Sequence, residues 1–247
     1  MYKRILVISD NIIMASSFQE IFEELDLMDV SVDYSISPLS DKFKFEEKLN
    51  KGVFVYNLKS DQHLEEIIEK YDLVFSIHCK QIFPKKLINS LKCMNVHPGY
   101  IPLNRGWYPQ VFSIIYDLPI GATIHEIDED LDHGNIIDRE LVEKEIIDTS
   151  FTLYNKVIQK EKSLLKKNLF SIISNSYTTI KPENEGHLYL RADFNKLCEI
   201  DLNQSTTAKD IINKLRALTH DEFKNAFFID PKTGKKVFIS INLEYEK

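Results

Sequence analysis

Residues 3–9 read KRILVIS, and this short apolar run decides the fold class. A run so rich in aliphatic and β-branched side chains is typical of a strand buried on both faces of a parallel sheet. Further strands are predicted at Val30–Ile36, Val53–Leu58, Leu73–Ile77 and Cys93–Val96. Helical signals lie between them, namely an apolar stripe in Ser16–Leu27, an N-cap at Ser60-Asp61 and a helix start at Pro84. This alternation predicts an α/β protein with a Rossmann-like, doubly wound, mostly parallel sheet.

The pattern changes after Ile120. The stretches GATIHEID (121–128) and NIIDRELVEKEI (135–146) alternate with period two and predict two adjacent strands. Thr149 to Ser176 carries the longest helical pattern, which would close a first domain of residues 1–180. Residues 181–247 form a small α+β appendage in this prediction. It holds a helix and a hairpin that joins Ala226–Ile229 to Lys236–Leu243. In the first domain, the lysine-rich segment Asp41–Lys51 is expected to be an irregular connection between two strands.

Composition narrows the class of protein. The chain has 247 residues, of which 43% are hydrophobic and 28% charged, and a net charge of −7. This excludes a disordered chain and disfavours nucleic acid or an anionic membrane as a partner. The apolar run near the N-terminus is too short for a secretory signal, and no window approaches a membrane span. A soluble cytoplasmic protein is expected, and its three cysteines, which form no CxxC pair, are expected to be free thiols.

The first strand is not followed by a glycine-rich phosphate loop. Ser9-Asp10-Asn11-Ile12-Ile13 stands where GxGxxG or GxxxxGK[ST] would be, and the chain has only 7 glycines. A nicotinamide or P-loop site is therefore not expected. Asn11 has two open interpretations: it binds phosphate or sugar at a helix N-terminus, or it only caps the helix.

The stretch MNVHPGYIPLNRGW (94–107) contains two candidate catalytic side chains. Asn95 and His97 lie at i and i+2 at the end of a strand, so they project to one face, at the end where open α/β sheets bind ligands. A neutral imidazole can take a proton from a nucleophile, and a carboxamide can bind the oxyanion of a tetrahedral intermediate. The pair suits acyl transfer, although an isolated buried histidine is often structural.

A second stretch, TIHEIDEDLDHGNII (123–137), runs from a predicted strand into an acidic loop. Asp128, Glu129, Asp130 and Asp132 crowd this loop before Gly134, at a spacing that does not match a calcium loop. We therefore expect no metal. The better use is one carboxylate beside His97 that raises its basicity and selects its tautomer.

Together the two motifs resemble the folate-dependent formyltransferase family. The resemblance covers roughly residues 1–180 and is strongest at 94–138. It implies the formyltransferase fold, 10-formyltetrahydrofolate as formyl donor and catalytic roles for Asn95, His97 and Asp132. Two departures concern the acceptor pocket: Pro98-Gly99-Tyr100-Ile101-Pro102 replaces the common Ser-Leu-Leu-Pro, and Asp132-His133-Gly134-Asn135 replaces Asp-Thr-Gly-Asp.

Within the family, the sequence is most similar to enzymes that formylate dTDP-linked 3- or 4-amino-dideoxyhexoses for surface polysaccharide such as O-antigen. The resemblance implies that the pterin contacts residues near the acidic loop and the 76–84 stretch, namely Ser76, His78, Lys80, Gln81, Ile82 and Asp128. It implies that the sugar nucleotide contacts Asn11, Arg105, Trp107, Tyr108, Arg216 and Asn225. Read without the resemblance, Trp107 is a loop anchor, His78 a structural histidine and Arg216 a surface ion pair.

Other functions stay open at this point. A formyl-folate hydrolase or a glycinamide ribonucleotide formyltransferase would use the same catalytic residues with another acceptor. A non-catalytic binding module on the same scaffold is the alternative from a different class. The apolar residues of the C-terminal strands exceed what a small hairpin can bury, so a homodimer is expected. They include Phe227, Phe228, Val237, Phe238, Ile239 and Ile241.

Overall fold

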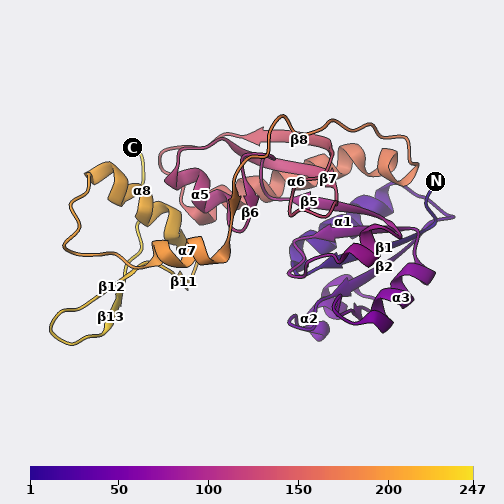
Figure 1. Cartoon of the computed structure of the whole chain (residues 1–247), viewed down its shortest axis with the longest axis horizontal. Coiled ribbons are helices and arrows are strands. Elements are labelled where there is room, and N and C mark those ends of the chain that lie inside the picture. The colour runs from indigo at the N-terminus through magenta and orange to yellow at the C-terminus, as the bar shows by residue number, and fades with distance from the viewer. Residues whose placement is uncertain (247) are drawn as a thin grey trace.

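The computed structural model describes residues 1–246, and a seven-stranded sheet forms its centre (Figure 1). The strand order is β3-β2-β1-β4-β5-β7-β8, so the order reverses between β1 and β4. The first five of these strands are parallel, whereas β7 is antiparallel to both β5 and β8. The mostly parallel, doubly wound sheet is confirmed. Its strands are β1 (Arg4–Ser9), β2 (Ser31–Ile36), β3 (Phe54–Val55), β4 (Leu73–Ile77), β5 (Lys92–His97), β7 (Ile120–Glu126) and β8 (Ile136–Val142).

Helices cover both faces of the sheet because the central strands are apolar on both sides. One core packs α1 and α6 against the sheet, with Phe18 and Leu165 among its fully buried residues. The other packs α3 and α4 through residues such as Ile67 and Leu87. The helices are α1 (Ile12–Glu24), α2 (Lys42–Leu49), α3 (Asp61–Lys70), α4 (Lys85–Ile88), α5 (Pro109–Ile115) and α6 (Ser150–Ile173).

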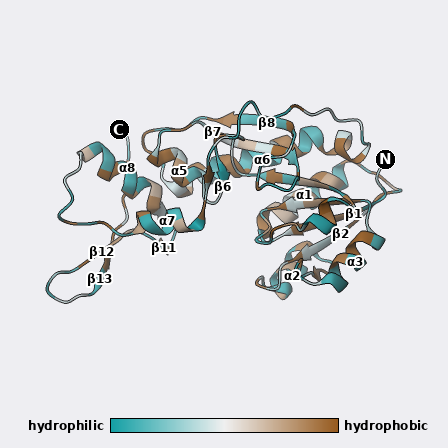
Figure 2. Ribbon diagram, viewed as in Figure 1, coloured by the Kyte–Doolittle hydropathy of each residue, from teal (hydrophilic) through white to brown (hydrophobic). Residues whose placement is uncertain are grey.

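The C-terminal region lies beyond α5, at the far end of the molecule from β1–β3 (Figure 1). A third core joins α5 to this region, and hydrophobic and hydrophilic residues alternate along α8 (Figure 2). The two-residue strand β6 (Arg105–Gly106) pairs with the region's first strand, β9. The remaining elements are β9 (Leu188–Tyr189), α7 (Arg191–Cys198), α8 (Ala208–Leu218), β10 (Thr219–His220), β11 (Phe223–Lys224), β12 (Phe227–Ile229) and β13 (Lys236–Phe238).

The structure corrects several boundaries. The lysine-rich segment expected to be a connection contains α2, which buries only Phe45 and Leu49 and so left a weak apolar pattern. The third strand and the last strand are both shorter than predicted, and α1 starts four residues earlier, at the cap provided by Asn11. Helices α5 and α7 were not predicted. Among residues 1–246, no helix has the length and apolarity needed to cross a membrane.

Candidate active site

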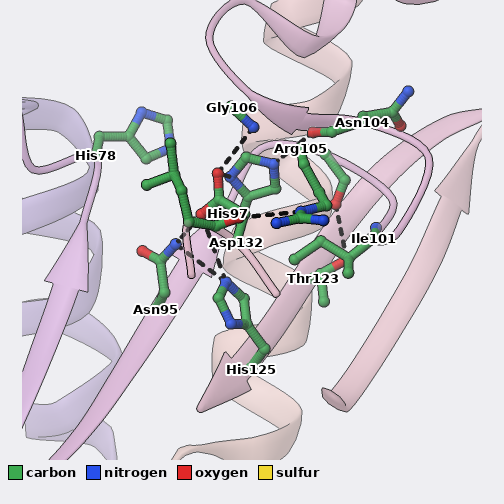
Figure 3. A network of polar contacts seen from close by, with 12 residues as sticks. His78, Asn95, His97, Ile101, Asn104, Arg105, Gly106, Thr123, His125 and Asp132 are labelled. Atoms are coloured by element: carbon green, nitrogen blue, oxygen red, sulfur yellow. Dashed lines mark hydrogen bonds and ion pairs between the residues drawn. The ribbon is translucent and has the colours of Figure 1, made fainter. Parts of the chain in front are cut away.

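Strand β5 delivers two of the predicted catalytic side chains to one face of the sheet. Asn95 pairs in register with Ser76 on β4 and with His125 on β7, and His97 pairs with Thr123. The i, i+2 spacing places both side chains on the same face, as expected for a strand. Figure 3 shows them converging on Asp132, which comes from the loop between β7 and β8.

Asp132 is the centre of this group. Its side chain is 8% exposed, its Oδ1 accepts from Asn95 Nδ2 over 3.0 Å, and its Oδ2 accepts from the Gly106 amide over 2.9 Å. Burial by itself raises the pKa of Asp132, but the nearby imidazoles of His97 and His125 and the Gly106 N–H together hold it well below its ordinary value. The carboxylate is therefore ionised at neutral pH and fixed from two sides.

The tautomer of His97 is set by a main-chain contact. The ring is 4% exposed, and its Nε2 lies 2.7 Å from the carbonyl oxygen of Asn104. A carbonyl oxygen only accepts, so Nε2 carries the hydrogen and Nδ1 holds the lone pair of the neutral ring. Nδ1 lies 3.5 Å from Asp132 Oδ2. The carboxylate thus lies beside His97 as predicted, but the main chain rather than the carboxylate selects the tautomer.

His125 is a member of the group that sequence reasoning missed. It is 1% exposed, and its Nδ1 donates to the carbonyl oxygen of Glu126 over 2.7 Å. Its Nε2 therefore accepts from Asn95 Nδ2, which lies 3.1 Å away. Both amide hydrogens of Asn95 are thereby engaged, one by Asp132 and one by His125. The register of β5 against β7 places His125 next to Asn95, and this register cannot be predicted from a single sequence.

The loop after His97 is shaped to admit the Asn104 carbonyl. A Cβ atom added to Gly99 would lie 2.5 Å from His97 Nε2 and 2.6 Å from the Asn104 oxygen. Thr123 Oγ1 donates to the Gly99 oxygen over 2.7 Å and accepts from the Ile101 amide over 3.1 Å, so β7 holds the loop in place. Glycine is needed here for close approach, not for its backbone freedom.

A family model described as "Formyl transferase" matches residues 34–169. A protein of Mycobacterium bovis named dTDP-4-amino-4,6-dideoxyglucose formyltransferase is 48% identical over 186 residues, which are 75% of this chain and 79% of that protein. This chain belongs to the formyl transferase family.

Two solved structures are similar to this formyltransferase over almost the whole length. A 4-N formyltransferase from Francisella tularensis has a TM-score of 0.92 and 45% identity, with 99% of both chains covered. A sugar N-formyltransferase from Shewanella sp FDAARGOS_354 has a TM-score of 0.93 and 37% identity, also with 99% of both chains covered. A second family model, described as "N-formyltransferase dimerization C-terminal domain", matches residues 193–245. The predicted family, fold and enzyme class are confirmed.

The residues predicted to contact folate lie around the end of β4. Ser76 is buried in the strand, and His78 is bound to Glu161. The side chain of Gln81 is fully used in anchoring its loop: Oε1 accepts from the Leu58 amide and Nε2 donates to the Tyr56 oxygen. In contrast, Ile82 is 79% exposed. Lys80 is also exposed, and its main-chain N–H donates to Asp10 Oδ2 over 2.7 Å. Contacts from this loop to the formyl donor, including those of Lys80 and Ile82, stay a prediction.

The acidic loop of the formyltransferase is tied to its surroundings by charge. Lys85 Nζ pairs with Glu129, which joins the loop to the segment after β4. Asp128 Oδ2 lies 2.7 Å from His133 Nδ1, and the contact with Asp128 raises the pKa of His133. Within the described part of the chain, no group of three or more His, Cys, Asp or Glu side chains has the arrangement of a metal site.

The residues predicted to bind the acceptor are spread over the molecule. Arg105 is 8% exposed, and its guanidinium donates to the carbonyl oxygens of Leu131 and Glu185. Trp107 is 38% exposed beside Tyr108, which in turn packs on Phe194 with ring centroids 4.3 Å apart. Arg105 therefore holds loops together, whereas Trp107 is the member of this group that stands at the surface.

Three further residues that were predicted to contact the sugar nucleotide make hydrogen bonds within the protein. Asn11 Oδ1 caps α1 by accepting from the Ile13 and Met14 amides, so the capping interpretation is confirmed for this oxygen. Arg216 is 6% exposed and donates to the carbonyl oxygens of Asp148 and Glu145, so it is not a surface ion pair. Asn225 Nδ2 donates to the Leu218 oxygen. Their contact with an acceptor stays a prediction.

Two cavities are described, and both lie away from Asn95, His97 and Asp132. One, of about 250 Å³, lies between α8 and the segment after α7, with Ile200 and Lys214 in its lining. The other, of about 310 Å³, lies at the start of β5, where Lys92 pairs with Glu126. Neither contains a residue of the catalytic group.

Proposed function

We propose that this formyltransferase moves the formyl group of 10-formyltetrahydrofolate to the 4-amine of a dTDP-linked 4-amino-4,6-dideoxyhexose. The observation that carries this is the match along 99% of the chain to the Francisella 4-N formyltransferase, C-terminal region included. The Mycobacterium bovis relative is named for the 4-amino sugar nucleotide. Solved structures of a sugar 3N-formyl transferase and of an N-formyltransferase in complex with dTDP-3-aminofucose have only 24–26% identity to this chain, so the 4-amine is favoured over the 3-amine.

The donor site fits a reduced folate. The exposed Ile82 offers an apolar contact for a pterin ring, and the pair Lys85–Glu129 holds the acidic loop close to the segment that carries Ile82. Gln81 stiffens that segment through its two bonds to main-chain groups of Tyr56 and Leu58. When bound, formyl-folate supplies an activated formyl carbon, and solved neighbours are described with folinic acid, 5-N-formyl-THF or tetrahydrofolate.

The proposed catalytic roles rest on the hydrogen-bond partners of His97 and Asn95. His97 Nδ1 accepts the proton that the attacking amine loses, and Asp132 beside it stabilises the imidazolium that results. His97 then returns a proton to the donor nitrogen as its bond to the formyl carbon breaks. Asn95 donates an amide hydrogen to the developing oxyanion by exchanging one of its two present bonds, to Asp132 or to His125.

The proposal also includes the roles of the two domains, a homodimer and a cytoplasmic location. Residues 1–180 are the catalytic domain, and residues 181–247 contact the acceptor and join two copies into a homodimer. The family model named for dimerization and the exposed Phe223, Val237 and Phe238 support the dimer. The net charge of −7 and the sugar-nucleotide substrate support a cytoplasmic enzyme of surface polysaccharide synthesis, with neither nucleic acid nor membrane as a partner.

One assay tests the proposed function. Purified protein is incubated with 10-formyltetrahydrofolate and, separately, with dTDP-4-amino-4,6-dideoxyglucose, a dTDP-3-amino sugar and glycinamide ribonucleotide. We expect the 4-amino sugar nucleotide to gain the mass of one formyl group with the highest kcat/KM. Formate release without an amine would indicate a hydrolase, and preference for glycinamide ribonucleotide would indicate the purine enzyme. Folate binding without turnover of any acceptor would indicate a non-catalytic binding module.

A further inference from the structure

Arg105 is a buried arginine next to the catalytic group, and its hydrogen bonds connect segments that are far apart in sequence. Its Nε donates to the carbonyl oxygen of Leu131 over 3.0 Å, and a terminal nitrogen donates to the carbonyl oxygen of Glu185. Among the described residues, the only carboxylate within 4 Å of this guanidinium is that of Glu185, which is 3.8 Å away and 82% exposed. Burial of a guanidinium without a close counter-ion costs free energy, so packing alone does not account for an arginine at this position.

The bond to Leu131 fixes the backbone just before Asp132. Asp132 has a φ of +48°, in the left-handed region that non-glycine residues rarely adopt, and such a conformation persists where surrounding contacts hold it. Arg105 Nε binds the carbonyl oxygen of the peptide that joins Leu131 to Asp132, and the Gly106 amide donates to Asp132 Oδ2 over 2.9 Å. Figure 3 shows Arg105 and Gly106 beside Asp132. Two consecutive residues of one loop thus hold both the backbone and the carboxylate of Asp132.

The C-terminal region holds the same two residues from the other side. Arg105 and Gly106 form β6, which pairs with β9. The approach is close, since a Cβ atom added to Gly106 would lie 2.1 Å from the Tyr189 oxygen. The second bond of Arg105, to the Glu185 oxygen, reaches the segment that leads into β9. Arg105 is therefore held between the C-terminal region and the acidic loop.

We propose that Arg105 is a positioning residue that fixes the backbone of the acidic loop so that the Asp132 carboxylate faces Asn95 and His97. The proposal rests on the proposed function, in which Asp132 stabilises the imidazolium of His97. Asp132 Oδ1 lies 3.0 Å from Asn95 Nδ2, and Oδ2 lies 3.5 Å from His97 Nδ1. A displacement of about 1 Å in such a group can lower the rate by about 10². This role differs from the direct contact with the sugar nucleotide that the sequence predicts for Arg105.

Kinetics of Arg105→Lys, alone and combined with Asp132→Asn, test the proposal. Lysine keeps the positive charge but lacks the planar fork that reaches Leu131 and Glu185 together. We expect the single variant to lower kcat between about 10-fold and 100-fold and to leave the KM of both substrates within about twofold. In the Asp132→Asn background the same change should lower kcat by no more than about twofold, because the carboxylate that Arg105 positions is gone.

Arg4→Lys is the matched control. Arg4 also binds a carbonyl oxygen, that of Glu69, and it pairs with Asp72 at the start of β1. The start of β1 is at the opposite edge of the sheet from the end of β5, where the catalytic group lies. The control should therefore leave kcat and the KM of both substrates unchanged.

Three kinetic results would overturn the proposal. One is an unchanged kcat in Arg105→Lys. Another is an equal fall of kcat in the wild-type and Asp132→Asn backgrounds, because Arg105 would then act independently of Asp132. The last is a raised KM for the sugar nucleotide with an unchanged kcat, which would assign Arg105 to the acceptor.

Folding and the choice of acceptor are separated from these results. If circular dichroism shows that Arg105→Lys does not fold, Arg105→Met replaces it in the same cycle, since it buries apolar atoms in place of the charge. Failure of both variants to fold would overturn the proposal and assign Arg105 to the fold alone. Every comparison uses whichever acceptor the wild type formylates. Preference for another acceptor therefore contradicts the proposed function but not the role of Arg105, and absence of any turnover contradicts both.

Discussion

His97 Nε2 lies 2.7 Å from the carbonyl oxygen of Asn104, and this contact leaves Nδ1 as the basic nitrogen of the neutral ring. Nδ1 lies 3.5 Å from Asp132 Oδ2, so the Nε2–H of the ring is held by a carbonyl acceptor on one side and a carboxylate lies beside the ring on the other. The contact with Asn104 therefore fixes the orientation of the ring relative to Asp132.

Replacement of His97 by Asn should remove the proton acceptor while keeping a polar side chain of smaller size. We expect kcat to fall by about 10³, within the range for loss of a general base, and dTDP affinity to stay within about twofold. Steady-state kinetics and calorimetry measure the two quantities. His187→Asn, at an exposed histidine of the C-terminal region, is the control. Retention of most of the wild-type kcat would refute the role of His97.

Asp132→Asn should lower kcat by about 10² or more, because the imidazolium of His97 loses its carboxylate partner. The pKa of Asp132 is depressed in the folded protein, so the carboxylate stabilises the fold above about pH 4, and this contribution is lost as the pH falls through the depressed folded value. The variant lacks this contribution. Its free energy of unfolding should therefore decline less steeply with acidification below pH 4, measured by urea unfolding at several pH values. A parallel decline in both proteins would contradict the depressed pKa.

Gly99→Ala tests the close approach of the loop to His97. The added methyl group would meet His97 Nε2 at 2.5 Å, so the ring or the Asn104 carbonyl must move. We expect kcat to fall between about 10-fold and 100-fold and stability to fall by about 1–3 kcal/mol, the usual cost of overpacking. Gly52→Ala is a matched control because a Cβ there would meet nothing within 4 Å. Equal kinetics for the two variants would show that the loop tolerates displacement.

Arg216→Ala separates a structural from a phosphate-binding role. The variant loses three hydrogen bonds, two of them to the carbonyl oxygens of Asp148 and Glu145 in the segment before α6. At about 1 kcal/mol for each bond, we expect stability to fall by about 2–4 kcal/mol, with dTDP affinity unchanged. Thermal unfolding and calorimetry give the two readouts. A large loss of dTDP affinity with little loss of stability would instead assign Arg216 to the diphosphate.

Local pattern was enough to predict much of this protein. The apolar runs of β1, β4 and β5 and the stripe of α6 are properties of residues close together in sequence, and so is the placement of Asn95 and His97 on one face. Helix α2 escaped prediction for the same reason, because only Phe45 and Leu49 are buried and its periodic signal is weak. The two motifs around His97 and Asp132 are specific enough to indicate the family from the sequence alone.

Only the tertiary structure decided which hydrogen-bond partners those residues have. The choice of the Asn104 carbonyl as partner of His97, the place of His125 beside Asn95 and the burial of Glu161 against His78, 83 residues away, depend on strand register and loop closure. Arg216 shows the same limit, since a guanidinium suits phosphate and main-chain carbonyls equally and only its surroundings choose between them. Periodicity records which face a side chain takes, whereas the hydrogen-bond partner on that face is set by distant segments that the fold brings within 3 Å.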